Sequence, residues 1–243
     1  ESGSLLVFLP GQAEIRRTPE RLAGTLPADA DLAPLYGALD TAAQDRAIRP
    51  PPPGRRKVVL ATSIAETSLT IEGVRVVVDS GLARVPLYEP ATGITRLETR
   101  RVSRASADQR RGRAGRTAPG VCYRLWDEAQ TAALAPYDRP EILDADLSPF
   151  ALDLKAWGVA DPSELSFLDA PPRAAFEEAT ALLRRLGAID EGGQLTAEGR
   201  ALARLSMPPR LGHMLNRAAP LGFGAVAGAL AALLSEPGTG GTS

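Results

Sequence analysis

The first half of the sequence predicts an α/β domain in which helices cover both faces of a parallel sheet. Short apolar segments of strand length alternate there with helical patterns, and this alternation is typical of parallel sheets built from strand–helix units. The predicted strands cover residues 5–9, 33–36, 58–61, 74–79 and 121–125. After Trp126 the composition changes, and helical patterns dominate the rest of the chain.

The charge of the chain places any polyanion site in one region. With 243 residues the chain is long enough for one large or two modest domains, and its net charge of -1 provides no general attraction to nucleic acid. Between Arg96 and Arg116, however, eight arginines stand against only Glu98 and Asp108. We therefore expect a polyphosphate ligand to bind near this segment.

Metal and membrane sites are not indicated by the sequence. The single His213 has no histidine or cysteine nearby, and the single Cys122 lies in an apolar run that predicts a buried structural thiol. The longest apolar run, residues 225–234, is too short to span a bilayer. We expect a cytoplasmic protein without a membrane segment or a bound structural metal.

Residues 106–116 predict a short basic helix whose residue types are hard to explain by a structural role alone. Ser106 and Gln109 have the spacing of a capping box, so the helix would begin at residue 107. Spacings of four and three place Gln109, Arg113 and Arg116 on one face, where the two like charges repel. This arrangement suits an anion such as the terminal phosphate of a nucleotide. A solvated basic face is the alternative interpretation.

Small polar residues follow the predicted strands at their carboxyl ends, where open α/β sheets gather ligands. The pattern predicts a helix that starts directly after Thr62, and the free N–H groups of its first turn would be available to a phosphate. Each of these residues could instead be an ordinary turn or cap residue, so the argument rests on their common edge. They are Gly11, Gln12, Thr62, Ser63, Ser80 and Gly81.

Three ordered segments resemble motifs IV, V and VI of the DEAH-box (DEAH/RHA) ATP-dependent helicases. They read LVFLPGQAEI from residue 6, KVVLATSIAETSLTIEG from residue 57 and QRRGRAGR from residue 109. The sequence most resembles the bacterial HrpB type, in which an arginine follows the first Gln-Arg pair of motif VI, as Arg111 does here. The resemblance implies the second of the two RecA-like lobes of a helicase motor.

The resemblance also implies roles for individual residues. Arg113 and Arg116 would be arginine fingers on the γ-phosphate of ATP, and Gln109 would help to place the attacking water. The other implied nucleotide contacts are Ser68, Thr70, Glu72 and Ile48, and the implied contacts to a nucleic-acid strand are Gly11, Gln12, Thr62, Ser63, Arg84 and Arg96.

Three positions depart from the usual pattern of the family. Ser63 stands where asparagine is usual, and Glu72 stands where aspartate is commoner. A contact to the nucleic-acid strand and a contact to the ribose of the nucleotide are therefore expected to be weaker than in relatives with the usual residues. Ile48 occupies about the place of an aromatic ring that stacks on the base, so we expect weak discrimination among nucleoside triphosphates.

The remaining segments predict the domain order. Residues 85–99 have two β-prone arms around a Pro/Gly turn, which resembles the hairpin between motifs V and VI in the family; a simple extension of the sheet is the alternative. We expect a RecA-like lobe over residues 1–136, a winged-helix domain over 137–208 and the truncated start of a ratchet-like helical bundle over 209–243.

The winged-helix prediction rests on three helices and a small hairpin. Ser148 would cap the first helix, with Phe150, Leu154 and Trp157 on one face. The second would span residues 172–186. Thr196 would cap the third, directly after a short hairpin. Because no basic recognition helix stands out, this domain is expected to brace the motor lobe.

The 243 residues contain neither a GxxxxGK[ST] phosphate loop nor a DEAH box. We therefore expect this segment to be inactive alone and to need a first lobe that holds ATP, or another triphosphate, with Mg²⁺. The expected partners are that lobe and single-stranded RNA, with DNA left open, and the expected state is a monomer. The alternatives are a non-enzymatic binding module built on a lone RecA-like lobe, and an autonomous winged-helix DNA binder.

Overall fold

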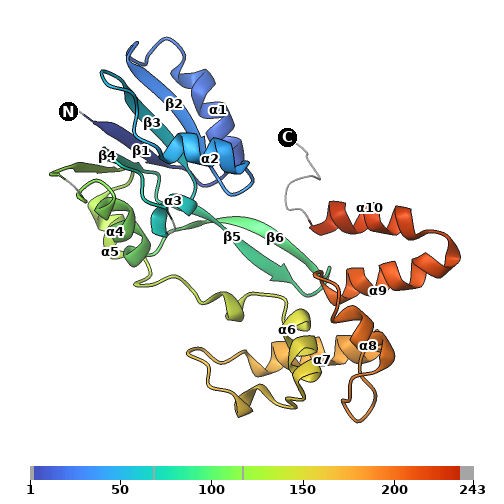
Figure 1. The fold of residues 1–243 in the computed structure, drawn as a ribbon. Coiled ribbons are helices and arrows are strands. Elements are labelled where there is room, and N and C mark those ends of the chain that lie inside the picture. The colour runs from blue at the N-terminus through green and yellow to red at the C-terminus, as the bar shows by residue number, and fades with distance from the viewer. Residues whose placement is uncertain (1–2, 68, 117, 236–243) are drawn as a thin grey trace. The chain divides into compact units, whose positions relative to one another are not determined.

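The computed structural model describes residues 3–67, 69–116 and 118–235, and Figure 1 shows the order of the elements along the chain. The contacts divide the chain into two compact units. The first unit comprises Glu1–Val85 and Glu98–Asp138, and the second comprises Pro86–Leu97 and Arg139–Ser243. The predicted boundaries at residues 136 and 208 stay a prediction.

The first unit is built on a five-stranded parallel sheet, as the sequence predicts. The strand order is β2-β3-β1-β4-β7, so the first and third strands of the chain lie side by side in the middle. The ends differ from the predicted ones by a few residues at most. The strands are β1 Ser4–Phe8, β2 Ala30–Leu35, β3 Arg56–Ala61, β4 Val74–Asp79 and β7 Val121–Arg124.

Helices cover both faces of this sheet, which confirms the predicted RecA-like α/β architecture. Alternate residues of β1 and β3 form two separate apolar clusters because successive side chains of a strand point to opposite faces. One cluster includes Ala47 of α2 and Ala65 of α3, and the other includes Ile15 of α1. The helices are α1 Gln12–Leu22, α2 Thr41–Ile48, α3 Ile64–Thr67, α4 Arg104–Gly112 and α5 Glu128–Ala132.

A two-stranded hairpin follows β4, as predicted. It consists of β5, Leu82–Glu89, and β6, Ile94–Arg101, with Gly93 at a positive φ of 69° in the turn (Figure 1). The outer part of the hairpin belongs to the second unit. There the backbone N–H of Tyr88 donates to the carbonyl oxygen of Asp144 at 3.0 Å.

The second unit contains the predicted winged helix. Its helices share one apolar cluster, and Ile189 and Leu195 form the antiparallel bridge of the small wing. Thr196 caps the helix after the wing, because its hydroxyl accepts from the N–H of Gly199 at 3.1 Å. The elements are α6 Ser148–Trp157, α7 Arg173–Arg185 and α8 Ala197–Leu202, with the short 3₁₀ turns η1 Glu141–Leu143 and η2 Pro162–Glu164.

Two further helices complete the second unit, and they agree with the two helical patterns expected after residue 208. They are α9 Pro209–Ala218 and α10 Gly224–Ser235, joined by the 3₁₀ turn η3 Ala219–Leu221. Gly222 adopts a left-handed conformation with φ of 83°, which ends the turn and separates the two helices. Figure 1 shows the pair as neighbouring helices at the end of the chain.

Two predictions for α6 are wrong. Leu147, not Ser148, is the N-cap residue, and both the N–H and the hydroxyl of Ser148 donate to the carboxylate of Asp146. Trp157 is 77% exposed and does not belong to the buried face. Instead, α6 buries Leu152, which belongs to the shared apolar cluster, and Leu154, and the helix ends at Trp157.

The two residues considered for a thiol or metal site have ordinary surroundings. Cys122 is only partly buried, although it packs against the sheet core, and burial is the main cause that raises the pKa of its thiol. His213 Nδ1 lies 2.9 Å from Glu198 Oε1. Within the described part of the chain, no helix is long and apolar enough to cross a bilayer, and no group of three or more potential metal ligands occurs.

Candidate nucleotide and nucleic-acid site

Helix α4 begins and ends earlier than the sequence suggests. The hydroxyl of Ser103 accepts from the N–H of Ser106 at 3.0 Å, so Ser103 is the N-cap residue and the predicted capping box at Ser106 is wrong. The helix ends at Gly112. Because Arg113 is already the C-cap residue, Gln109, Arg113 and Arg116 do not line one continuous helical face, and that prediction is also wrong.

Arg113 reaches helix α3 and the loop that follows it. Its Nε donates to the carbonyl oxygen of Glu66 at 2.8 Å, its Nη2 donates to the same oxygen, and its Nη1 donates to the carbonyl oxygen of Leu69 at 2.6 Å. The residue is only 6% exposed. Burial lowers the pKa of Arg113, and the charge of the neighbouring Arg116 lowers it further.

Arg116 reaches the same loop from beyond the end of α4. Its Nη1 donates to the hydroxyl oxygen of Thr70 at 2.9 Å. In the described part of the chain, neither Arg113 nor Arg116 forms an ion pair with a carboxylate, although the charge of Glu66 acts favourably on Arg113. Two neighbouring guanidinium groups that bond only to neutral oxygens form a site that an anion would stabilise.

Arg110, which the sequence interpretation left without a role, forms a buried ion cluster in the same motif. It is 1% exposed, its Nε lies 3.0 Å from Glu66 Oε2, and its Nη1 lies 2.9 Å from Asp79 Oδ1. The Nη1 also donates to the carbonyl oxygen of Leu82, and the guanidinium lies 4.9 Å from the centre of the Phe8 ring. Arg110 thus joins α4 to the end of β4 and to helix α3.

A signal for this cluster is present in the sequence. Asp79 ends a strand that is otherwise apolar except for Arg75, and a carboxylate in such a place needs a cation when the strand is buried. Asp79 is fully buried, and its Oδ1 also accepts from the N–H of Gly81 at 2.9 Å. The pattern does not say which arginine supplies the cation.

The other predicted nucleotide residues are less closely connected. Gln109 and Glu72 are exposed, and Ile48 is half-buried at the end of α2. Among the residues that the structure describes, no side-chain hydrogen bond joins any of these three to Arg113 or Arg116. Ser68 lies outside the described residues. The structure therefore brings together Arg113, Arg116 and Thr70 from the predicted nucleotide site.

The predicted strand-binding residues lie at the carboxyl ends of β1 and β3. Gly11 is the buried N-cap residue of α1, and Gln12 is its first residue. Thr62 directly follows β3, its N–H donates to the carbonyl oxygen of Leu35 at 3.2 Å, and its own carbonyl oxygen accepts from Ala65. Ser63 beside it is exposed.

Arg84 lies directly over Gly11. A Cβ atom at Gly11 would come within 2.9 Å of Arg84 Nε, so the absence of a side chain at Gly11 is what admits the guanidinium. Arg84 Nη2 also lies 3.4 Å from Glu14 Oε1. Arg96, the remaining predicted contact, belongs to the second unit and pairs with Glu89 at 3.1 Å.

Comparisons with known proteins agree with this motif assignment. Residues 1–118 match the family described as helicase conserved C-terminal domain, and residues 179–207 match the winged-helix helicase associated domain HA2. The chain is 51% identical over 237 residues to the ATP-dependent RNA helicase HrpB of Escherichia coli (strain K12). This alignment covers 98% of the chain and 29% of that relative. It is 45% identical over 218 residues to the probable ATP-dependent RNA helicase DHX34 of Homo sapiens, covering 88% of the chain and 19% of that relative.

The fold agrees as well. The crystal structure of the Escherichia coli DEAH/RHA helicase HrpB superimposes with a TM-score of 0.91 at 50% sequence identity, over 100% of this chain and 31% of that one. The chain thus spans less than a third of the length of these relatives. By its motifs, its sequence and its fold, the chain belongs to the DEAH-box helicase family.

Proposed function

We propose that the chain is the C-terminal part of an ATP-dependent RNA helicase, in which it supplies arginine fingers for nucleotide hydrolysis and half of a track for a single strand. The observation that carries the proposal is the pairing of Arg113 and Arg116 on the loop after β3 without a carboxylate partner among the described residues. Burial beside a second cation lowers the pKa of Arg113. A triphosphate would supply the anion that this pair lacks.

The chemistry needs a second lobe. Phosphoryl transfer requires a phosphate cradle and Mg²⁺ ligands in addition to cations, and these 243 residues contain no phosphate loop. We infer that another lobe of the protein holds ATP with Mg²⁺, where the metal neutralises phosphate charge. The chain taken alone is then inactive, and closure of the lobes brings Arg113 and Arg116 to the γ-phosphate while Gln109 orients water.

We assign the binding of the RNA strand to Gly11, Thr62 and Arg84, at the edge of the sheet where the strands end. Thr62 directly follows β3, and the segment that begins there includes α3, whose Glu66 carbonyl oxygen accepts from Arg113. One continuous segment therefore links the proposed strand contacts to the proposed fingers. Loss of the γ-phosphate would release the fingers and allow this segment to shift, which couples hydrolysis to movement along RNA.

The test is nucleic-acid-stimulated ATP hydrolysis by the full-length protein. Arg113→Ala should lower kcat by about 10³-fold or more, because an arginine finger acts mainly in the transition state, and it should leave the affinity for single-stranded RNA nearly unchanged. Arg111→Ala is the matched control: this side chain is 63% exposed, lies in the same motif and pairs only with Asp108 at 3.6 Å among the described residues.

Two results would contradict the proposal. An equal loss of kcat and of strand affinity in Arg113→Ala would assign this arginine to the shape of the loop and not to the chemistry. Full-length protein that binds RNA without hydrolysing any nucleoside triphosphate would favour the non-enzymatic binding module instead.

A further inference from the structure

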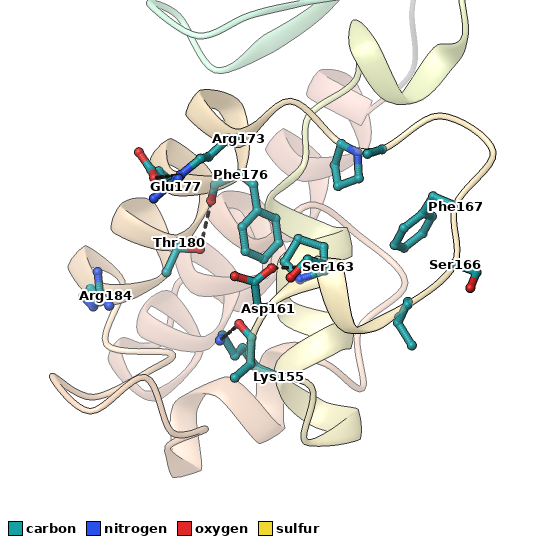
Figure 2. A pocket seen from close by; sticks show the side chains of 15 residues that line it. Lys155, Asp161, Ser163, Ser166, Phe167, Arg173, Phe176, Glu177, Thr180 and Arg184 are labelled. Carbon is teal, nitrogen blue, oxygen red and sulfur yellow. Dashed lines mark hydrogen bonds and ion pairs between the residues drawn. The ribbon is translucent and has the colours of Figure 1, made fainter.

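Two hollows adjoin the end of α6 in the second unit, and Lys155 borders both of them. The larger one, of about 900 Å³, is shown in Figure 2. Charged side chains of both signs line it. Arg173 Nε lies 2.8 Å from Glu177 Oε1, and Asp161, which accepts from the N–H of Ser163 at 2.8 Å, lines the same wall as Lys155 and Arg184. The two carboxylates therefore offset part of the positive charge of this larger hollow.

The smaller hollow, of about 490 Å³, has a different charge balance. Lys155, Arg200 and Arg204 line it, and no aspartate or glutamate does. Lys155 Nζ donates to the carbonyl oxygen of Ala160 at 2.6 Å, and Arg200 Nη1 donates to that of Leu195 at 2.8 Å. These carbonyl groups orient the cations without neutralising them. None of the ion pairs found among the described residues includes these three side chains.

An exposed aromatic ring completes this hollow. Trp157 lines it and is 77% exposed, although an indole of this size is largely buried in most proteins. The fold does not require this residue for its core, because α6 is anchored by Leu152 and Leu154. Gly158 then ends the helix in a left-handed conformation, which leaves the last turn uncovered. The ring face is available to a planar ligand.

We propose that this hollow is a second binding site for single-stranded RNA, separate from the track of the motor lobe. Phosphate groups would bind to Lys155, Arg200 and Arg204, and one base would stack on Trp157. Basic side chains beside an exposed aromatic ring are the combination that binds single strands without sequence preference. The site rests on the proposed function for the identity of the polyanion. It adds a contact in the winged-helix unit, which the sequence interpretation had assigned only to bracing.

The test titrates the 243-residue chain with a single-stranded oligouridylate at several salt concentrations. Trp157→Ala should weaken binding about tenfold and Trp157→Phe by no more than about twofold, because stacking needs an aromatic face but not the indole nitrogen. Arg204→Gln should reduce the slope of log affinity against log salt by about 0.7, as expected when one phosphate contact to a single strand is lost. The fluorescence of Trp157 should be quenched by the RNA.

Arg173→Gln is the matched control, because Arg173 is exposed, lines the neighbouring hollow and is already paired with Glu177. It should leave the affinity and the salt slope unchanged. Unchanged affinity and slope in both Trp157→Ala and Arg204→Gln would overturn this site and leave the motor proposal intact. Displacement of the RNA from Trp157 by a polyglutamate peptide at lower concentration would show that the hollow prefers an acidic protein. Failure of the unaltered 243-residue chain to bind RNA would overturn this second site without contradicting the motor proposal, which gives the chain only half of the track.

Discussion

Arg110 and Arg113 lie three residues apart in one motif and are both buried, yet their partners differ in kind. Arg110 faces two carboxylates, those of Glu66 and Asp79, at 3.0 and 2.9 Å. Among the described residues, the side-chain hydrogen bonds of Arg113 go to backbone carbonyl oxygens, and the charge of Arg116 acts against it. Within this part of the chain the first cation forms two ion pairs and the second forms none.

The difference teaches that burial alone does not separate a structural arginine from one that acts on a ligand. The charge of Arg110 is neutralised by carboxylates, and its ion pairs hold α4 to the sheet. Arg113 has its donors oriented by neutral oxygens while its charge stays available to an incoming anion. The same distinction separates two arginines of the second unit: Arg173 is paired with Glu177, whereas Arg204 lacks an ion-pair partner among the described residues.

The largest expected effect on stability tests whether the ion pairs of Arg110 stabilise the fold. Arg110→Ala should lower the free energy of unfolding by about 3–5 kcal/mol, because it leaves buried carboxylates without their cation. Arg111→Ala, at an exposed position of the same helix, should change it by less than about 0.5 kcal/mol. Denaturant unfolding of both variants measures this difference. Similar small effects in both would show that the ion cluster contributes nothing to the fold.

A smaller effect is expected at the strand-binding edge. Gly11→Ala should displace the guanidinium of Arg84, since the new Cβ would lie 2.9 Å from its Nε. The backbone at Gly11 is extended, with φ of -161°, so the substitution itself is not strained. Affinity for single-stranded RNA should fall about fivefold, which corresponds to about 1 kcal/mol for one exposed ionic contact.

Gly37→Ala provides the control for this edge, because a Cβ at Gly37 meets nothing within 4 Å among the described atoms. Its RNA affinity should equal that of the unaltered protein. Equal RNA affinity for Gly11→Ala as well would remove Arg84 from the strand contacts and leave that edge without its proposed cation.

The smallest expected effect concerns the base of the nucleotide. Ile48 is half-buried at the end of α2 and offers no aromatic face. The kcat/KM values of the full-length protein for ATP, GTP, CTP and UTP should therefore agree within about tenfold, since stacking contributes on the order of 1–3 kcal/mol per base where it exists. Strict selectivity for ATP would contradict this expectation.

Much of the fold could be predicted because it depends on local patterns. The apolar strands β1 and β3, the hairpin and the wing all follow from short runs of residues and the turns between them. The sequence signals a buried carboxylate at Asp79 but not its partners, because Glu66 and Asp79 lie 44 and 31 residues before Arg110 in the chain. Only the packed sheet brings these three side chains together.

The errors at helix ends have a related cause. Ser103 and Ser106 are both suitable cap residues, and both are buried. The N–H of Ser103 donates to Asp138 Oδ1 at 3.2 Å, a contact 35 residues along the chain that favours Ser103 as the cap and that the local pattern does not contain. Trp157 has the spacing of a buried face with Phe150 and Leu154, but the helix ends at Trp157 and the side chain is 77% exposed. Periodicity describes one helix, whereas burial depends on what packs against it.

The uncompensated charge of Arg113 is tested most directly by the affinity of the full-length protein for ADP with aluminium fluoride and Mg²⁺, a mimic of the transferring phosphoryl group. Arg113→Ala should lower this affinity by about 10²–10³-fold while leaving the affinity for ADP nearly unchanged, because the guanidinium acts on charge that is present only in the transition state. Equal affinity of Arg113→Ala and the unaltered protein for the mimic would show that Arg113 only supports the loop at Glu66 and Leu69.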